Sequence, residues 1–194
     1  MKTVDREIRK IVTLPENIVP FLVQGRLIKV CIPGSQGQKD TDWGWGIVVN
    51  FTKQKINPKN IKNMGKNREL QQLIENQETH YVIDVYLYVS DRLTSDNIVQ
   101  PGDFKKKEGR LGIVPVVLHA TTIEAISSVQ VFLPQNHKAA DKTVELTYFE
   151  VMKRLEGGVP LLDPLDDMQI ESKTLDKLLQ TKASLQKELE ASDI

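Results

Sequence analysis

The chain has 194 residues with 26 basic and 26 acidic side chains, so no net charge directs it as a whole to nucleic acid or to an anionic membrane. Its hydrophobic share of 40% and charged share of 27% are those of an ordinary globular protein and exclude wholesale disorder. The single cysteine, Cys31, excludes an internal disulfide, and the sequence has neither a secretory signal nor a run of about 18 apolar residues. We expect a soluble protein with no membrane span.

Residues 1–13 have a helical composition, and Pro15 and Pro20 interrupt that helix before a sheet begins. Five runs rich in β-branched and aromatic residues follow without long helices between them. They cover residues 26–32, 46–51, 81–89, 111–119 and 126–133. This pattern predicts a mainly β fold, a small five-stranded barrel with flanking helices. Pro115 cannot donate to a ladder, so the fourth run should lie at a sheet edge or be bulged.

Two intervals between the predicted strands are too long for plain turns. Residues 52–78 form an insertion whose second half, 68–74, has helical composition and spacing. Residues 90–110 form a second long loop, in which Pro101 and Gly102 indicate a turn. We expect both insertions to be exposed.

The pattern becomes helical after Pro134. Asp141 is a candidate N-cap for a helix that Gly157 ends. An irregular apolar and acidic segment follows at 159–168, and residues 173–189 then carry an amphipathic leucine stripe that requires a partner surface.

The sequence contains no assembled catalytic motif. It has neither a phosphate-binding P-loop nor a dinucleotide-binding glycine fingerprint, so it cannot be an ATPase by itself. Three histidines lie far apart, outside any zinc-ligand spacing: His80, His119 and His137. We therefore expect no enzyme activity, no metal site and no cofactor.

The most unusual tetrapeptide is Trp43-Gly44-Trp45-Gly46. Two indoles beside glycines could stack on bases or on another ligand. The alternative is that one ring fills the end of the barrel while the glycines allow a tight strand start. We favour the core position for one tryptophan and retain Trp45 as the candidate for RNA stacking.

Basic residues cluster in the two insertions and leave the chain polarised, with an acidic C-terminal part. The first cluster lies in residues 53–68, which contain no acidic residue and six cations: Lys53, Lys55, Lys59, Lys62, Lys66 and Arg68. The second cluster lies in residues 105–110, where Glu108 is the one carboxylate beside four cations: Lys105, Lys106, Lys107 and Arg110. Such clusters can bind an RNA backbone without reading its sequence, although a solvated loop gives the same pattern. An RNA-binding barrel is therefore one hypothesis for the function.

Several stretches resemble the arch insertion of the nuclear exosome-associated DExH-box RNA helicases, the helicase family of the TRAMP complex. They are residues 14–22, 25–30, 43–51, 81–85, 126–134 and 158–168. The resemblance spans about residues 14–170 and includes no ATP-binding or DExH motif. It therefore implies an excised domain of an ATP-dependent RNA helicase, without its catalytic core.

In that family the arch is a helical stalk carrying a KOW-type β-barrel. The resemblance implies a stalk end and linker at 1–20, a barrel at 21–134 interrupted by the two insertions, and C-terminal helices at 135–194. It also implies the partners: adaptor proteins with arch-interaction motifs, structured RNA such as tRNA or rRNA precursors, and the exosome and helicase core through the parent chain. The implied location is the nucleus and nucleolus, in RNA processing and decay.

The resemblance assigns a peptide-binding arginine of the family to Arg26, where a guanidinium can pair with an aspartate of the adaptor peptide. An acidic family position corresponds to Asp84, and strand alternation puts Val82 and Tyr86 on the face of Asp84. A second family arginine is replaced by Gln130, which removes one cation from the expected site.

Overall fold

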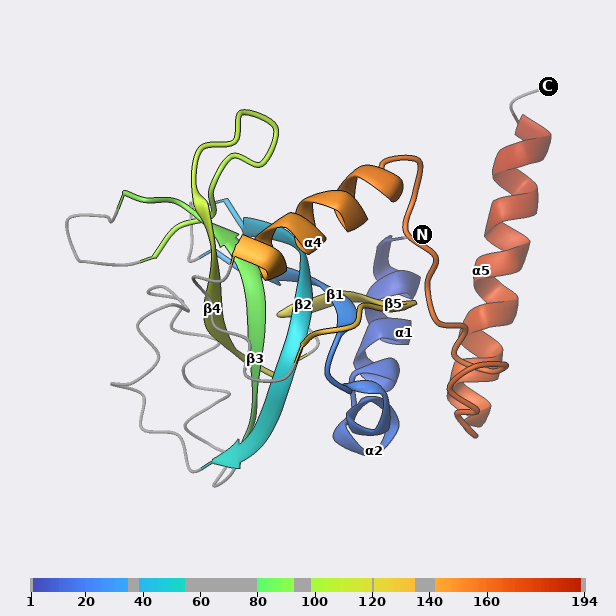
Figure 1. Ribbon diagram of the computed structural model, residues 1–194. Coiled ribbons are helices and arrows are strands. Elements are labelled where there is room, and N and C mark those ends of the chain that lie inside the picture. The colour runs from blue at the N-terminus through green and yellow to red at the C-terminus, as the bar shows by residue number, and fades with distance from the viewer. Residues whose placement is uncertain are drawn as a thin grey trace.

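The computed structural model describes residues 2–34, 39–54, 80–92, 99–119, 121–134 and 142–192. Its centre is a five-stranded antiparallel sheet in the order β4-β3-β2-β1-β5, flanked by helices (Figure 1). The strands are β1 (Arg26–Ile32), β2 (Thr41–Gln54), β3 (His80–Val89), β4 (Arg110–Val117) and β5 (Ile123–Gln130). The predicted fold class is confirmed, and all five predicted strands are present.

The largest differences from the predicted strand boundaries are in β2 and β5. β2 begins at Thr41, because the backbone pairing with β1 continues through the Trp-Gly repeat, and Gly44 pairs with Val30. β5 ends at Gln130, so residues 131–133 lie outside the sheet. The predicted helical piece at 68–74 and the predicted N-cap Asp141 lie outside the described residues.

The outer strands of the sheet are β4 and β5. Pro115 lies in β4, as its missing N–H predicts. The free edge of β5 is covered by the irregular segment after α4, where the N–H of Ser128 donates to the carbonyl of Pro160 at 3.1 Å. The N–H of Leu162 donates to the carbonyl of Ile126, also at 3.1 Å. This coverage satisfies backbone groups that an exposed edge leaves open.

The first face of the sheet carries Ile28, Val48 and Val85, all with 0% exposure. The helices α1 (Lys2–Val12) and α5 (Lys173–Ser192) lie on this side, and Leu175 of α5 is buried in the same cluster. An ion pair of 2.8 Å between Lys182 and Asp5 joins the two helices. The predicted leucine stripe of 173–189 thus has a partner surface at its N-terminal end.

The second face carries Leu27, Ile47 and Tyr86, and α4 (Lys142–Arg154) covers it (Figure 1). The buried Tyr148 of α4 donates its hydroxyl proton to the carbonyl of Trp45 at 2.7 Å. Burial, and secondarily Tyr88, raise the pKa of Tyr148 far above its ordinary value, so it stays a neutral donor. This bond fixes α4 against β2.

Pro15 has a different effect from the one expected. α1 ends at Val12, but Pro15 opens the short helix α2 (Pro15–Ile18), which leads into the 3-10 turn η1 (Val19–Phe21). The first residue of a helix does not use its N–H in the helix, so proline is suited to that position.

Among the described residues, no helix combines the length and the apolar composition that a membrane span requires.

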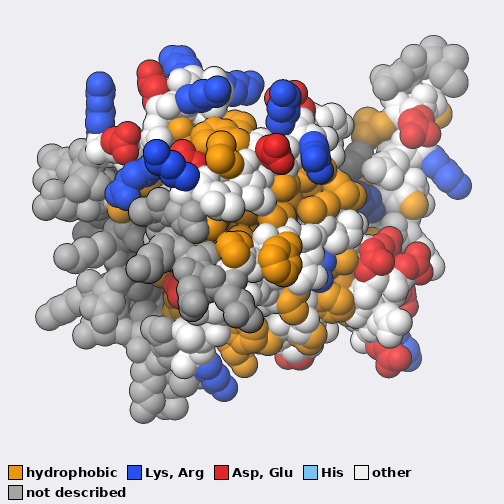
Figure 2. All heavy atoms as spheres, viewed as in Figure 1, with side chains coloured by type: hydrophobic (Ala, Val, Ile, Leu, Met, Phe, Trp, Pro, Cys, Tyr) orange, Lys and Arg blue, Asp and Glu red, His pale blue; other side chains and the backbone are white. Residues whose placement is uncertain are grey.

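Charge is distributed unevenly over the face drawn in Figure 2. Most of the visible Lys and Arg side chains lie at the top of the molecule, around α4 and the loop beside it, and several Asp and Glu side chains lie near α5. This distribution agrees with the polarity predicted from the sequence.

Candidate functional site

The candidate site begins at a backbone turn immediately before β1. Gly25 has a φ of +93°, a conformation that side chains with a Cβ rarely adopt. Its N–H donates to the carbonyl of Val48 at 2.8 Å, and its own carbonyl accepts from the N–H of Val131 at 2.7 Å. The turn therefore joins β2 to the chain leaving β5 and sets the direction of the next residue, Arg26.

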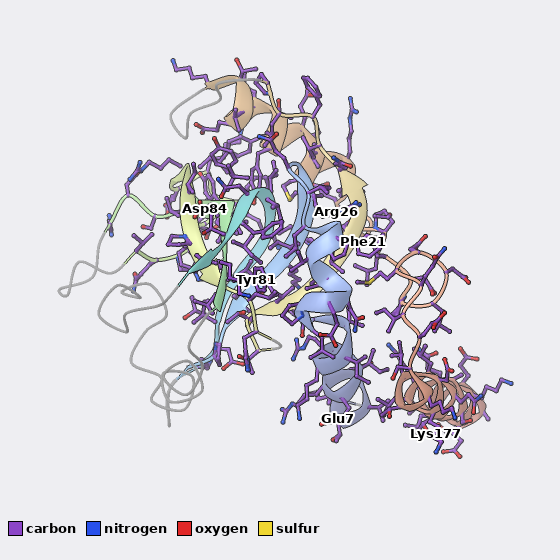
Figure 3. All side chains as sticks on the ribbon, turned by 90° about the horizontal axis from the view of Figure 1, so that it is seen from below. Glu7, Phe21, Arg26, Tyr81, Asp84 and Lys177 are labelled. Atoms are coloured by element: carbon purple, nitrogen blue, oxygen red, sulfur yellow. The ribbon has the colours of Figure 1, made fainter. Side chains whose placement is uncertain are left out.

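Arg26 lies half-buried at the start of β1, close to Phe21 (Figure 3). Its Nε donates to the carbonyl of Phe21 at 3.0 Å, and its Nη1 donates to the carbonyls of Ser128 at 3.2 Å and Ser127 at 3.4 Å. Burial lowers the pKa of Arg26, but a guanidinium titrates so far above neutrality that the charge remains. These bonds connect the η1 turn to β5.

The remaining donors of Arg26 define what the site can bind. A guanidinium has five N–H donors, and the two on Nη2 have no hydrogen-bond partner among the described residues. Arg26 also makes no ion pair with a described carboxylate. The described residues therefore leave the two N–H donors of Nη2 unused, while the other donors hold the side chain in place.

Gln130 lies directly across from Arg26 in the β1/β5 register. Its side chain is exposed, and its Nε2 donates to the carbonyl of Gln24 at 3.1 Å. The residues after it form, with Val23 and Gln24, a surface hollow of about 540 Å³. Phe132 borders this hollow with 86% of its surface exposed, and Val23 is 37% exposed.

Phe132 and Val23 were missed by the analysis of the sequence. Phe132 stands in an apolar run that predicts a strand up to residue 133, and a large aromatic side chain in such a run is expected to be buried. The available signal was alternation: Val131 and Leu133 are buried with the second face, so Phe132 between them points the other way.

Asp84 lies apart from this hollow. It is in β3, two strands from β1, and it faces Asn50 of β2 and Pro115 of β4 (Figure 3). Its neighbours Ile83 and Val85 pack on the first face, so Asp84 points to the second face. Arg26 precedes Leu27, a residue of the second face, and points to the first.

Burial raises the pKa of the Asp84 carboxyl. Val82 is half-buried, whereas Tyr86 is fully buried at 0% exposure and packs in the core of the second face. The structure thus brings together Arg26 and Gln130 among the predicted peptide-binding residues. It does not bring Asp84, Val82 and Tyr86 to them.

The described cations of the RNA prediction are mostly on one turn. Those of the second insertion are all exposed: Lys105, Lys106, Lys107 and Arg110. Arg110 lies 3.6 Å from a carboxylate oxygen of Asp91. Lys53 lies elsewhere, with its amine 5.8 Å from the ring centre of Tyr81. The other predicted cations lie outside the described residues: Lys55, Lys59, Lys62, Lys66 and Arg68.

The two tryptophans have different environments. Trp43 is 6% exposed and belongs to the core of the first face, which confirms that one ring fills the barrel. Trp45 is half-buried and lines a groove together with Lys105 and Lys107. The structure therefore brings Trp45 close to the cations with which the RNA prediction grouped it.

Comparison with known families decides the relationship. The family described as "Mtr4-like, beta-barrel domain" matches residues 14–194 of this chain. The chain belongs to the Mtr4-like β-barrel domain family. This confirms the resemblance found in the sequence, and the region matched is the barrel domain, which is not the catalytic core of those helicases.

Relatives of this Mtr4-like domain occur in animals, fungi and plants. The human "Exosome RNA helicase MTR4" is 36% identical over 180 residues, which are 90% of this chain and 15% of that protein. The fission yeast (Schizosaccharomyces pombe) "ATP-dependent RNA helicase mtr4" is 32% identical over 181 residues, 89% of this chain and 14% of that protein. The Arabidopsis thaliana "DExH-box ATP-dependent RNA helicase DExH10" is 29% identical over 163 residues, 81% of this chain and 14% of that protein.

Proposed function

We propose that this Mtr4-like domain docks short apolar and acidic peptides of adaptor proteins in the hollow beside Arg26. The observation that carries the proposal is the combination of an anchored guanidinium, whose two Nη2 N–H groups have no partner in the part of the chain that the structure describes, and a Phe132 ring that is 86% exposed. A cation held in place by its other donors loses little conformational freedom when it pairs with a carboxylate.

The chemistry of such a peptide follows from the two halves of the site. An aspartate would accept charge-assisted hydrogen bonds from Nη2 of Arg26. An apolar side chain would cover Phe132 and Val23, and burying most of an exposed ring is worth about 2 kcal/mol. Through a parent helicase, the domain would bring adaptor-bound RNA substrates to the exosome in the nucleus and nucleolus.

The test uses Gln130, because its side chain is exposed and can be changed without altering the core. We expect Gln130→Arg to tighten binding of a synthetic arch-interaction peptide by about 0.5–1.5 kcal/mol, since it adds a cation across from Arg26. Gln130→Glu should weaken binding by a similar amount. Isothermal titration calorimetry at two salt concentrations measures both.

The matched control is the same peptide with its aspartate replaced by asparagine. This peptide should bind wild type, Gln130→Arg and Gln130→Glu weakly and with similar affinities. If wild type and both variants bind the peptide equally, the hollow is not the docking site. If the wild-type domain binds no such peptide, the proposed function itself is wrong.

RNA binding is a second candidate function, favoured by the exposed turn with Lys105, Lys106 and Lys107. Replacing these three lysines by alanine should weaken binding of a tRNA and reduce the dependence of the logarithm of affinity on the logarithm of salt concentration by about 2 to 3 units. Filter binding between low and physiological salt measures this slope. An unchanged slope would show that the lysines of this turn do not contact the RNA.

A further inference from the structure

A surface groove beside α4 lies apart from the proposed peptide site. It has a volume of about 960 Å³ and runs between α4 and the 104–107 turn. It shares no lining residue with the hollow that contains Phe132. Its apolar lining comes from Trp45, Phe104, Leu146, Phe149, Met152, Leu155 and Val159.

Some apolar side chains of α4 face the core, and others line the groove. Val144 and Tyr148 face the core at 0% and 3% exposure. Leu146, Phe149 and Met152 instead line the groove at a spacing of three residues, and Leu146 is 65% exposed. Residues three apart lie on one side of a helix, so α4 presents a second apolar stripe to the groove, in which Leu146 is exposed and the half-buried Phe149 and Met152 also pack against the core.

The opposite wall of the groove is held by aromatic packing. Phe104 stacks on Phe149 with ring centres 5.0 Å apart and planes at 21°. Edge contacts of 5.6 Å to Tyr88 and 5.7 Å to Tyr148 surround the same ring. These contacts fix the 104–107 turn beside α4, so the groove has two defined walls in the free protein.

The rim of the groove is positive. Lys105 and Lys107 lie on the turn and Lys153 lies on α4, against one carboxylate, Glu156. All four side chains are exposed. In Figure 2 hydrophobic side chains are visible near the top of the molecule, over α4, with Lys and Arg side chains around them. A ligand that fits this surface is apolar in the middle and negatively charged at its edges.

We propose that this groove is a second docking site, which binds an amphipathic helix of a partner protein with carboxylates flanking its apolar stripe. A helix fits because the apolar stripe of α4 runs along a helix axis, and parallel stripes pack side chain against side chain. The carboxylates lie where Lys105, Lys107 and Lys153 can pair with them.

The lining argues against single-stranded RNA as the occupant. Bases bind by stacking on accessible aromatic faces. Here one face of Phe104 is occupied by Phe149, Trp45 is half-buried, and the exposed apolar side chain of the groove is the aliphatic Leu146. An RNA held by the lysines alone would leave this apolar surface in water.

The experiment is a selection from a phage library of helical peptides on the wild-type domain, with counter-selection on Leu146→Glu. The enriched peptides should carry an apolar stripe flanked by Asp or Glu. A synthetic enriched peptide should bind at least tenfold more weakly to Leu146→Glu and Lys153→Glu, measured by fluorescence anisotropy. Binding should be unchanged in Leu189→Glu, a matched change of an exposed leucine on α5.

The same peptide should bind Gln130→Glu as it binds wild type, which separates this groove from the hollow beside Arg26. Enrichment of basic or uncharged peptides would overturn the proposal, as would no enrichment. It would also be overturned if an oligouridine RNA shifted the NMR signals of Leu146 and Met152, or if Leu146→Glu dissociated a dimer in sedimentation experiments, because the occupant would then be RNA or a second copy of this chain.

Discussion

Gly25→Ala is expected to destabilise the domain by about 3 kcal/mol or more, the largest effect of any single methyl group that we anticipate. A Cβ at this position would lie 1.9 Å from the carbonyl oxygen of Val131, which is a backbone atom and cannot rotate away. The φ of +93° adds strain for any residue with a Cβ. Urea denaturation followed by circular dichroism measures the loss.

Gly157→Ala is the matched control, because a Cβ there has no atom within 4 Å. We expect its free energy of unfolding to stay within about 0.5 kcal/mol of wild type. Gly25→Ala should also weaken binding of the arch-interaction peptide, since the turn at Gly25 sets the direction of Arg26. A Gly25→Ala protein as stable as wild type would show that the backbone of this turn is not as described.

Arg26→Glu is expected to weaken binding of the arch-interaction peptide by about 2–4 kcal/mol, which raises the dissociation constant by about thirtyfold or more. The variant loses the cation that we propose pairs with the aspartate of the peptide. It also places a carboxylate near the carbonyl oxygens of Phe21 and Ser128, which accept from the arginine in the wild type. Some loss of stability is therefore expected as well, about 2 kcal/mol.

Arg26→Lys separates the two roles of this side chain. Lysine keeps the charge but cannot reproduce the forked bonds to Phe21 and to the two serine carbonyls. It should lose stability without losing most of the peptide affinity. Calorimetry well below each melting temperature gives the affinities, and thermal melts give the stabilities. If affinity follows stability in both variants, Arg26 acts only through the fold.

A double-mutant cycle completes the test. Combining Arg26→Lys or Arg26→Glu with an aspartate-to-asparagine change in the peptide isolates the energy of the charge pair from other losses. A coupling energy near zero would exclude a direct contact between Arg26 and that aspartate.

The sequence located the five strands and the three longer helices of this domain, but not the short helix α2 or the turn η1. Alternation and β-branched composition depend on local backbone preferences, so they located all five strands and the helices at the two ends. The missing N–H of Pro115 correctly placed β4 at an edge of the sheet, because that property belongs to the residue itself. The motifs around Arg26 and the two tryptophans were likewise enough to indicate the family.

Only the tertiary structure decided which side chains meet. The bonds from Arg26 to Ser127 and Ser128 join residues more than 100 positions apart in the sequence. Asp84, grouped with Arg26 by resemblance, lies on the other face of the sheet. The register shift between Val48 and Asn50 shows why counting residues along β2 does not fix such positions: an extra residue in one strand changes which side chains lie opposite one another.

The same holds for the candidate binding surfaces. Phe132 alternates with the buried Val131 and Leu133, so its exposure depends on what the fold places on its side, and the α4 groove exists because Phe104 meets Phe149. Local composition determined the strands and helices, since these follow from backbone geometry over a few residues. The packing of distant segments determined the candidate binding surfaces, since each is built from residues that only the folded chain brings together.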